Sequence, residues 1–598
     1  MLHEQMRHWT IKEWKNAYQE QKIALKDLFE YVRDFSNEDN AWITLADESQ
    51  LQRQIEVLSD KSADELPLFG VPFAVKDNID VIDFPTTAAC PDIQYVATED
   101  ATVIKQLKAA GAIVVGKTNL DQFATGLVGV RSPYGAVKNS FNPKYISGGS
   151  SSGSSVVVAN GLVPFSLGTD TAGSGRVPAG HNNIVGLKPT KGWFSTYGLI
   201  PACRTQDVIS IFALTVEDAW QVAHVMQGHD ELDDYSRKHP GNVPSAFSKN
   251  KIAIPKQLEF YGDKTSEKAF EIAVDKLRQL NFEIVPIDFT VFNELASALY
   301  NDAWVAERTA SIDSLVDRDK THPVIHQIID QGDKFNAVDT MQAEYRRARF
   351  SQLINETLAE FDALMVPTAP TIYTIKEVET DPLTKNSHMG AYTNFVNLAD
   401  LSAIALPNLI REDGLPSGIT MIAPAWHDIA LAQFGVQWQS LNDLPVGNSD
   451  SIKQFSVSLT LAPLTDSTID VAVVGAHLTN MPLNYQLTDN QAVLIETTKT
   501  AKEYRLYVLT NAQPLKPGLE HVAENGEEIL IEIWRMPIAN FGAFLSLIPE
   551  PLGIGTIKTV SDKLVKGFIC EPGALKNAID ITKFGGWKSY IKSLKTTN

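Results

Sequence analysis

The sequence predicts an α/β protein that carries a second, smaller domain rich in β-strands. Up to about residue 440, helical apolar patterns alternate with short apolar strands, which is typical of a sheet covered by helices. After about residue 455, short strand patterns dominate. A chain of 598 residues is also too long for one hydrophobic core. We therefore expect a first domain over residues 1–440, a linker over 441–455 and a second domain over 456–598.

The elements of the first domain follow from the spacing of its apolar residues. Helical spacing covers residues 12–35 and 48–58, and a short apolar strand then ends at Lys76. Four later segments continue the alternation: a helix, a glycine stop and a strand over 102–119, a helix and a strand over 265–289, a buried strand over 361–370, and two strands around an Asp-Gly turn over 406–424.

The second domain shows a series of short strand patterns without an internal repeat. The expected strands cover residues 455–463, 469–477, 492–500, 504–511 and 528–537. Their number and short length predict a β-rich unit.

Composition and charge exclude several classes of protein. The chain has 44% hydrophobic and 21% charged residues, as a folded globular protein does. Its formal net charge of −20 disfavours nucleic acid and anionic membranes as partners, so an anionic substrate has to be attracted by a local cation. Cys90, Cys203 and Cys570 show neither metal-ligand spacing nor a disulfide pattern, which favours a reducing compartment.

Two further features concern location and cofactors. The first residues contain no apolar signal-peptide segment, and no uncharged apolar run approaches the length of a membrane span. We therefore expect a cytoplasmic protein. No residue pattern indicates a metal or an organic cofactor, so none is expected.

A run of glycines and serines over residues 147–155 has two interpretations. Its composition alone is typical of a flexible linker. Its flanks favour a functional loop, because it leads at once into the apolar residues 156–159 and then into the patterned segment 163–180. The residues by themselves leave both interpretations open.

The same region contains the parts that a serine nucleophile requires. Serine is a weak nucleophile at its ordinary pKa and needs a base and donors for the developing oxyanion. Ser174 follows small residues, so the backbone N–H groups of Thr171, Ala172 and Gly173 are candidates for an oxyanion hole. A Gly-Ser turn is, however, more often only a turn.

Lys76 is the candidate base, and Ser150 is the candidate proton relay between Lys76 and Ser174. A lysine serves as a base only when burial or a neighbouring cation lowers its pKa well below about 10.4. Taken alone, a lysine at the end of a strand is more often a solvated surface residue. The combination of the three residues, rather than any one of them, indicates catalysis.

Four motifs resemble those of the amidase signature family: Phe73-AVKDN, Gly148-GSSSGSS, Gly168-TDTAGSGRVPAG and Gly186-LKPTKG. The resemblance implies a mixed central sheet covered by helices. It also implies a Ser–cis-Ser–Lys triad in which Ser174 is the nucleophile, Ser150 follows a cis peptide bond and Lys76 is the base. The family commonly has Gly-Gly-Ser-Ile-Arg at the nucleophile, whereas this chain has Ala-Gly-Ser-Gly-Arg. We expect Asp170 and Arg176 to hold this loop in place.

The segment 293–315 bears on the substrate. It is expected to form one helix, on which Tyr300 and Arg308 lie eight residues apart and point to adjacent faces. Arginine can grip a carboxylate with two parallel hydrogen bonds, and a tyrosine hydroxyl can add a third. An exposed arginine on an amphipathic helix is the alternative interpretation.

The Tyr300–Arg308 segment, the loop 124–135 and the appended second domain resemble the allophanate hydrolases. That resemblance implies that Tyr300, Arg308 and Gly126 bind a small anionic amide. It further implies hydrolysis of allophanate (urea-1-carboxylate) to ammonia and carbon dioxide, through an acyl-enzyme and N-carboxycarbamate. Another amidase or an amidotransferase subunit is the alternative function, and a scaffold without catalytic activity is a third.

The second domain resembles the C-terminal domain of allophanate hydrolases, which is related to the gamma-glutamyl cyclotransferase-like fold. The resemblance rests on residues 473–484, 533–537 and 545–555, and the cyclotransferase acid is not clearly preserved. It implies decarboxylation of N-carboxycarbamate with His477 as the candidate histidine, and a structural role is the alternative. We also expect a homodimer and an association with enzymes of urea or cyanurate breakdown.

Overall fold

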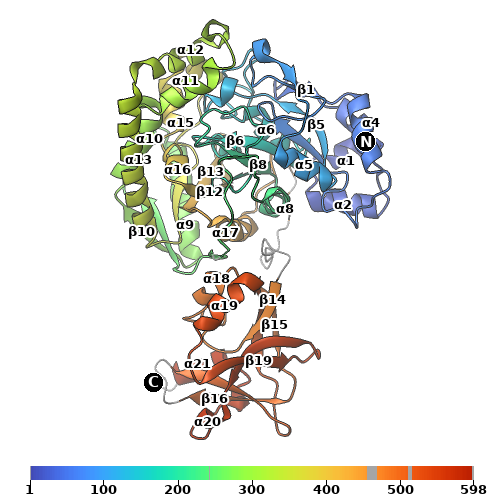
Figure 1. Ribbon diagram of the computed structural model, residues 1–598, viewed down its shortest axis with the longest axis vertical. Coiled ribbons are helices and arrows are strands. Elements are labelled where there is room, and N and C mark those ends of the chain that lie inside the picture. The colour runs from blue at the N-terminus through green and yellow to red at the C-terminus, as the bar shows by residue number, and fades with distance from the viewer. Residues whose placement is uncertain (1, 242, 451, 454–467, 510–514, 596–598) are drawn as a thin grey trace. The chain divides into compact units, whose positions relative to one another are not determined.

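A computed structural model describes residues 2–241, 243–450, 452–453, 468–509 and 515–595. The chain divides into two compact units, and most of the second is drawn in orange to red in Figure 1. The first unit comprises Met1–His239 and Lys249–Val457, and the second comprises Pro240–Ser248 and Ser458–Asn598.

An eleven-stranded sheet forms the centre of the first unit. In spatial order its strands are β1 (Trp42–Leu45), β5 (Ile113–Thr118), β2 (Pro72–Lys76), β6 (Phe165–Asp170), β8 (Val208–Ala213), β7 (Val185–Lys188), β12 (Leu401–Ile410), β13 (Pro416–Pro424), β11 (Ala363–Pro367), β9 (Lys251–Pro255) and β10 (Glu283–Ile287). Strands β5, β2 and β6 run parallel to one another, as do β11, β9 and β10, whereas the strands from β6 to β11 alternate in direction. The predicted mixed sheet is confirmed.

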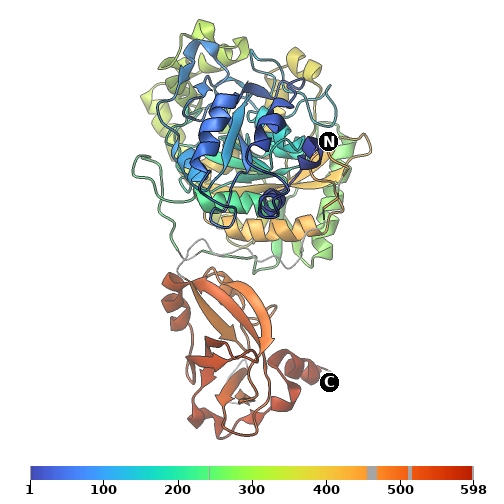
Figure 2. The same ribbon diagram turned by 90° about the vertical axis from the view of Figure 1, so that its right-hand side faces the viewer.

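Helices cover this sheet (Figures 1 and 2). They are α1 (Leu2–Met6), α2 (Ile11–Gln19), α3 (Asp27–Arg33), α4 (Glu48–Val57), α5 (Thr102–Ala109), α6 (Ser152–Ala159), α7 (Val177–His181), α8 (Val216–Met226), α9 (Lys264–Gln279), α10 (Thr290–Asn301), α11 (Val305–Asp313), α12 (Pro323–Ile329), α13 (Ala337–Leu358), α14 (Ile375–Thr380), α15 (Thr384–Met389), α16 (Phe395–Leu398) and α17 (Asp428–Ser440). Most of the elements predicted for this unit are present.

The predicted helix over residues 12–35 is in fact two helices, α2 and α3. The backbone of Gln21 has a φ of 55°, in the left-handed region, and ends the first helix. A capping box between Thr10 and Glu13 fixes where that helix begins. Strand β1, which follows α3, is a strand that the periodicity did not indicate.

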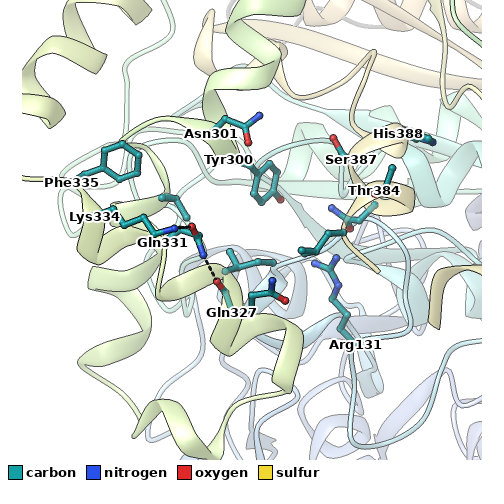
Figure 3. A pocket seen from close by; sticks show the side chains of 14 residues that line it. Arg131, Tyr300, Asn301, Gln327, Gln331, Lys334, Phe335, Thr384, Ser387 and His388 are labelled. Atoms are coloured by element: carbon teal, nitrogen blue, oxygen red, sulfur yellow. Dashed lines mark hydrogen bonds between the residues drawn. The ribbon is translucent and has the colours of Figure 1, made fainter. Parts of the chain in front are cut away.

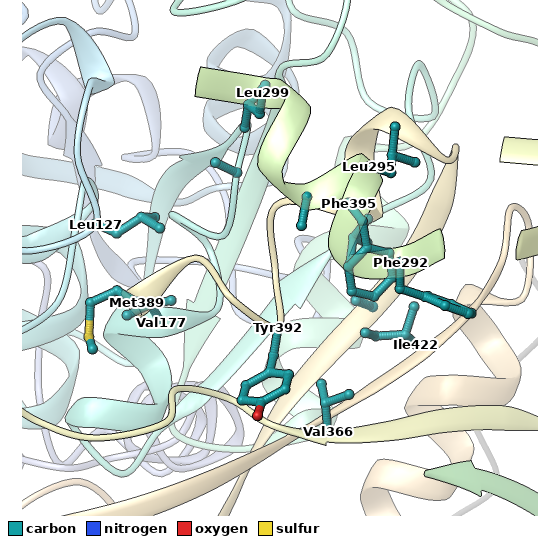
Figure 4. Close-up of a cluster of buried hydrophobic side chains, with 14 of the residues drawn as sticks. Leu127, Val177, Phe292, Leu295, Leu299, Val366, Met389, Tyr392, Phe395 and Ile422 are labelled. Carbon is teal, nitrogen blue, oxygen red and sulfur yellow. The ribbon is translucent and has the colours of Figure 1, made fainter. Parts of the chain in front are cut away.

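An aromatic and aliphatic core fixes α10 against the sheet. Phe292, Leu295 and Leu299 recur at helical spacing and are buried, and Phe292 packs edge-on against Phe395 of α16 with ring centroids 5.3 Å apart (Figure 4). Tyr300 follows directly after the last residue of this stripe and is half-buried at its edge. The core therefore sets the position of Tyr300.

The second unit contains a five-stranded and a three-stranded sheet. The first has the order β15 (Val493–Lys499), β18 (Leu530–Pro537), β14 (Thr468–Val473), β20 (Leu564–Cys570) and β19 (Leu552–Lys558), and the second has the order β17 (Lys516–His521), β16 (Tyr504–Leu509) and β21 (Ile579–Asp580). Its helices are α18 (Tyr485–Thr488), α19 (Ile538–Ser546), α20 (Pro572–Leu575) and α21 (Trp587–Lys595). Four predicted strands are confirmed as β14, β15, β16 and β18, whereas the strand predicted over 455–463 lies outside the described residues.

The chain passes between the units in two segments, and hydrogen bonds attach residues of each segment to one of the units. Residues 240–248 belong to the second unit, in which Ser245 Oγ donates to the carbonyl of Ala492 at 2.7 Å. In the expected linker, the backbone carbonyls of Pro445 and Gly447 accept hydrogen bonds from the side chain of Asn183, a residue of the first unit, at 2.8 and 2.9 Å. This part of the segment is thus bound to the first unit. Within the described residues, no helix is long and apolar enough to cross a membrane.

Candidate active site

Lys76 lies where two parallel strands end side by side. It is the last residue of β2, which pairs in parallel with β6, so the two strands end at the same edge of the sheet. Its side chain is fully buried, and its Nζ donates to Ser150 Oγ at 2.8 Å, Ser151 Oγ at 2.9 Å and Thr169 Oγ1 at 2.7 Å. The structure thus brings the candidate base and the candidate relay serine together. The peptide bond between Gly149 and Ser150 is cis, as predicted.

Burial lowers the pKa of Lys76 from its usual value of 10.5 to about 7, although Asp121, Asp207 and Asp170 favour the charged form. The three hydrogen-bond partners of Nζ are hydroxyl groups rather than carboxylates, so no ion pair holds the proton on the lysine. A substantial fraction of Lys76 is therefore neutral near pH 7. A neutral amine is the form that can accept a proton.

We expect kcat/KM for malonamate, a small anionic amide, to rise with pH through about 7 and then to level off. Below this value Lys76 is an ammonium and cannot accept a proton, whereas above it the amine is free. A pH–rate profile measures the midpoint. A profile that keeps rising toward about pH 10, the ordinary range of lysine, would contradict this assignment.

A buried ion pair holds the loop that carries Ser174. Arg176 Nε and Nη2 donate to the two carboxylate oxygens of Asp170, each at 2.9 Å, and both side chains are fully buried. The same carboxylate accepts the backbone N–H groups of Gly173 at 3.0 Å and Gly175 at 2.9 Å. The predicted structural roles of Asp170 and Arg176 are confirmed, and the two residues fix the backbone on both sides of Ser174.

The backbone N–H groups beside Ser174 differ in their availability. The N–H of Gly173 already donates to Asp170. Those of Thr171, Ala172 and Ser174 donate to no group among the described residues. Ala172 retains this donor although the family commonly has glycine at its position. Thr171, Ala172 and Ser174 are therefore better candidates for oxyanion donors than Gly173.

The hydroxyl of Ser174 makes no hydrogen bond within the described part of the chain, and the side chain is 1% exposed. No hydrogen bond joins it to Ser150 among these residues. The proton relay expected from the sequence therefore has its Lys76–Ser150 half formed in this structure. Its second half requires the hydroxyl of Ser174 to turn toward Ser150.

The sequence does not predict several residues that hold the candidate active site together. Ser151 and Thr169 bind Lys76 directly. Asp207 accepts a hydrogen bond from the Thr171 hydroxyl, beside the candidate oxyanion donors. No sequence pattern indicated these contacts, because they join strands and loops that are far apart along the chain.

Asp121 shapes the loop that contains Gly126. Its carboxylate accepts the N–H groups of Val128, Gly129 and Arg131 at 2.9 to 3.1 Å, and its own N–H donates to the carbonyl of Ser150 at 3.1 Å. A Cβ atom at Gly126 would lie 2.5 Å from an oxygen of Asp121, so a larger residue does not fit there. Close packing against Asp121 therefore explains why residue 126 is a glycine.

Tyr300 and Arg308 come together although the single helix predicted for them is wrong. Helix α10 ends at Asn301, α11 begins at Val305, and Asp302 between them adopts an extended conformation. The carboxylate of Asp302 binds the guanidinium of Arg346 of α13 at 2.7 to 3.1 Å, which stabilises the break. The turn directs Arg308 back toward Tyr300.

The guanidinium of Arg308 is buried and lacks a carboxylate partner. It donates to the hydroxyls of Tyr300 at 3.2 Å and Thr125 at 3.1 Å, and the side chain is 0% exposed. Its Nε has no hydrogen-bond partner. Within the described residues no Asp or Glu lies within ion-pair distance of it. A buried cation with an unused donor is suited to an anionic ligand.

His477 lies in the second unit, after β14. Its ring is 9% exposed, Nε2 lies 2.8 Å from Gln486 Oε1, and the ring packs on Phe568 and Phe544 with centroids 4.9 and 5.5 Å away. Burial lowers its pKa, so the imidazole is neutral near pH 7. No group of three or more potential metal ligands occurs among the described residues.

Comparison with known proteins is consistent with these two units. Residues 25–431 match the family described as amidase, and residues 469–592 match the allophanate hydrolase C-terminal domain. The chain is 44% identical to urea amidolyase from Saccharomyces cerevisiae over 98% of this chain, and it spans 33% of that protein's length. It is 31% identical to a glutamyl-tRNA(Gln) amidotransferase subunit from Clostridium acetobutylicum, over 69% of this chain and 95% of that one.

Among solved structures, the Kluyveromyces lactis allophanate hydrolase superposes with a TM-score of 0.84 and 42% identity. The match covers 98% of this chain and 100% of that one. Both units therefore have counterparts in a single known protein. The chain belongs to the amidase family, and it carries an allophanate hydrolase C-terminal domain after its amidase domain.

Proposed function

We propose that the chain hydrolyses allophanate to ammonia and carbon dioxide. The observation that carries the proposal is the pair formed by buried Arg308 and half-buried Tyr300, in which Arg308 lacks a carboxylate partner and contacts Thr125, beside the Gly126 loop. Allophanate is a urea that bears a carboxylate, so this pair would select it over neutral amides. The likeness to a solved allophanate hydrolase over the whole chain supports the same substrate.

The proposed reaction begins with proton transfer. Neutral Lys76 accepts a proton from Ser150, which takes the proton of Ser174 as Ser174 Oγ attacks the terminal amide carbonyl. The oxyanion is held by the backbone N–H groups of Thr171, Ala172 and Ser174. Lys76 then returns the proton through Ser150 to the departing ammonia.

The second half of the reaction releases the acyl group. Water attacks the ester on Ser174 with Lys76 again acting as the base through Ser150, and N-carboxycarbamate leaves. This product loses carbon dioxide. The carboxylate stays bound to Arg308 and Tyr300 throughout, which keeps the reacting carbonyl in place.

Ammonia release from allophanate, malonamate and glutamine tests the proposal. We expect turnover of the first two substrates, because both carry a carboxylate only one atom away from the amide carbonyl. We expect little turnover of glutamine, whose carboxylate is separated from the amide carbonyl by three carbon atoms and has an ammonium group beside it. Glutamine as the preferred substrate would instead favour an amidotransferase role, the function named for one relative of this chain.

For the second unit, we propose that His477 takes part in decarboxylation of N-carboxycarbamate. Its burial among aromatic rings and its neutral imidazole support a role in a pocket rather than at the surface. A purely structural unit is the alternative.

A His477→Ala variant should slow the initial release of carbon dioxide by about tenfold and leave the first ammonia unchanged. Initial rates of both products from allophanate measure this, and His521→Ala, an exposed histidine of the same unit, is the control. Unchanged carbon dioxide release would assign the unit a structural role.

We also propose a cytoplasmic location, which three buried free cysteines support. A homodimer and an association with enzymes of urea or cyanurate breakdown stay predictions.

A further inference from the structure

A cavity of about 710 Å³ opens in front of Tyr300 in the first unit. Its wall combines residues of α10, α12, α15 and the loop that ends at Arg131 (Figure 3). Of the 14 residues that line it, none is an aspartate or a glutamate. The chain as a whole has 72 acidic and 52 basic residues, so this lining differs in sign from the net charge of the protein.

Arg131 is the inner cation of this cavity. Its side chain is 1% exposed, and its guanidinium donates only to the backbone carbonyls of Thr125 at 3.0 Å and Pro382 at 2.7 Å. Its Nε has no partner. In the described chain no carboxylate lies within ion-pair distance of this guanidinium, so its charge remains available to an anion.

Lys334 is the outer cation. It is exposed, and its ammonium donates to the neutral amide of Gln331. The acidic neighbours along the chain, Asp330 and Asp333, both pair with Arg318 at 3.0 and 2.6 Å. Arg318 also pairs with Asp313, so three carboxylates share one guanidinium and are neutralised only in part. None of the three lines the cavity, and the lysine and the arginine in its lining, Lys334 and Arg131, both carry positive charge toward it.

We propose that this cavity is an anion antechamber, in which Lys334 and Arg131 collect a small carboxylate-bearing amide before it reaches the Tyr300–Arg308 pair. The inference rests on the proposed function. An overall charge of −20 repels such a substrate, and a local cationic cleft overcomes this repulsion by raising its concentration near the site. Neutral amides gain nothing from the cavity.

Three variants that each make the chain more negative by one charge test the proposal. Lys334→Ala removes the outer cation, and Gln327→Glu adds a carboxylate to the exposed cavity wall. The control is Lys268→Ala, which removes an exposed lysine that pairs with Glu412 outside the lining. All three positions are at the surface, so folding is preserved.

The measurement is kcat and KM for allophanate and for its neutral carboxamide counterpart, biuret, in about 20 mM and about 500 mM NaCl. These concentrations change the Debye length from about 20 Å to about 4 Å. We expect both cavity variants to lower kcat/KM for allophanate about fivefold at low salt, with kcat unchanged and the loss removed at high salt. The control and all rates with biuret should stay at the wild-type value.

The possible results distinguish a failure of the cavity proposal from a failure of the proposed function. If the wild type releases ammonia from allophanate but the cavity variants behave like Lys268→Ala, the antechamber is overturned and the proposed function stands. If the wild type releases no ammonia from allophanate, the proposed function fails and the antechamber fails with it.

Discussion

Replacing Ser174 by alanine should reduce ammonia release from allophanate by about 10⁴-fold or more, because no acyl-enzyme can form without the nucleophile. The loop should stay in place, since Asp170 binds Arg176 and the N–H groups of Gly173 and Gly175 rather than the Ser174 side chain. The measurement is a steady-state ammonia assay.

Ser155→Ala provides the matched control for this variant. Ser155 is also a buried serine of the Gly/Ser-rich region, but its hydroxyl donates to the carbonyl of Ser152 in its own helix and accepts a hydrogen bond from Asn182 Nδ2 at 3.2 Å. Its replacement should leave activity within a few-fold of the wild type. Normal turnover by Ser174→Ala would end the assignment of the nucleophile.

Replacing Arg308 by alanine should raise KM for allophanate about 100-fold, because the substrate carboxylate loses its buried cation. The rate with biuret, which has no carboxylate, should change little. Tyr300→Phe removes one hydrogen bond and keeps the ring, so a smaller increase of about tenfold is expected. Steady-state kinetics with both substrates distinguish these effects.

Arg308→Lys separates loss of charge from loss of packing at this buried position. It keeps the positive charge but loses the planar pair of donors, so it should bind allophanate better than the alanine variant and less well than arginine. Equal losses with allophanate and biuret in all three variants would show that the pair supports the fold rather than binding a carboxylate.

The motifs of the candidate active site could be predicted because they are local in sequence. The Gly/Ser-rich run and the Ser174 loop are short ordered segments whose residue types match their chemistry, and β2 ends at Lys76 as its apolar pattern indicates. The hydroxyls that surround Lys76 could not all be predicted. Thr169 approaches through the parallel pairing of β2 with β6, which apolar periodicity alone does not specify.

The Tyr300–Arg308 pair, the candidate substrate site, could be predicted only in part. Helical periodicity continues across residues 302–304 and predicts one helix, whereas in the structure Asp302 is extended and pairs with Arg346. The break brings Arg308 to Tyr300, which the uninterrupted helix would have placed on an adjacent face. The Asp302–Arg346 contact joins segments that are far apart along the chain, so local helical propensity does not predict it.

The comparison of allophanate with biuret as substrates of the wild-type chain tests the central claim most directly. The two molecules differ only in a carboxylate replaced by a carboxamide, so the ratio of their kcat/KM values measures recognition of the charge. We predict a ratio of about 100 or more in favour of allophanate. A ratio near one, or a preference for biuret, would contradict the claim that the Tyr300–Arg308 pair makes this amidase selective for an anionic substrate.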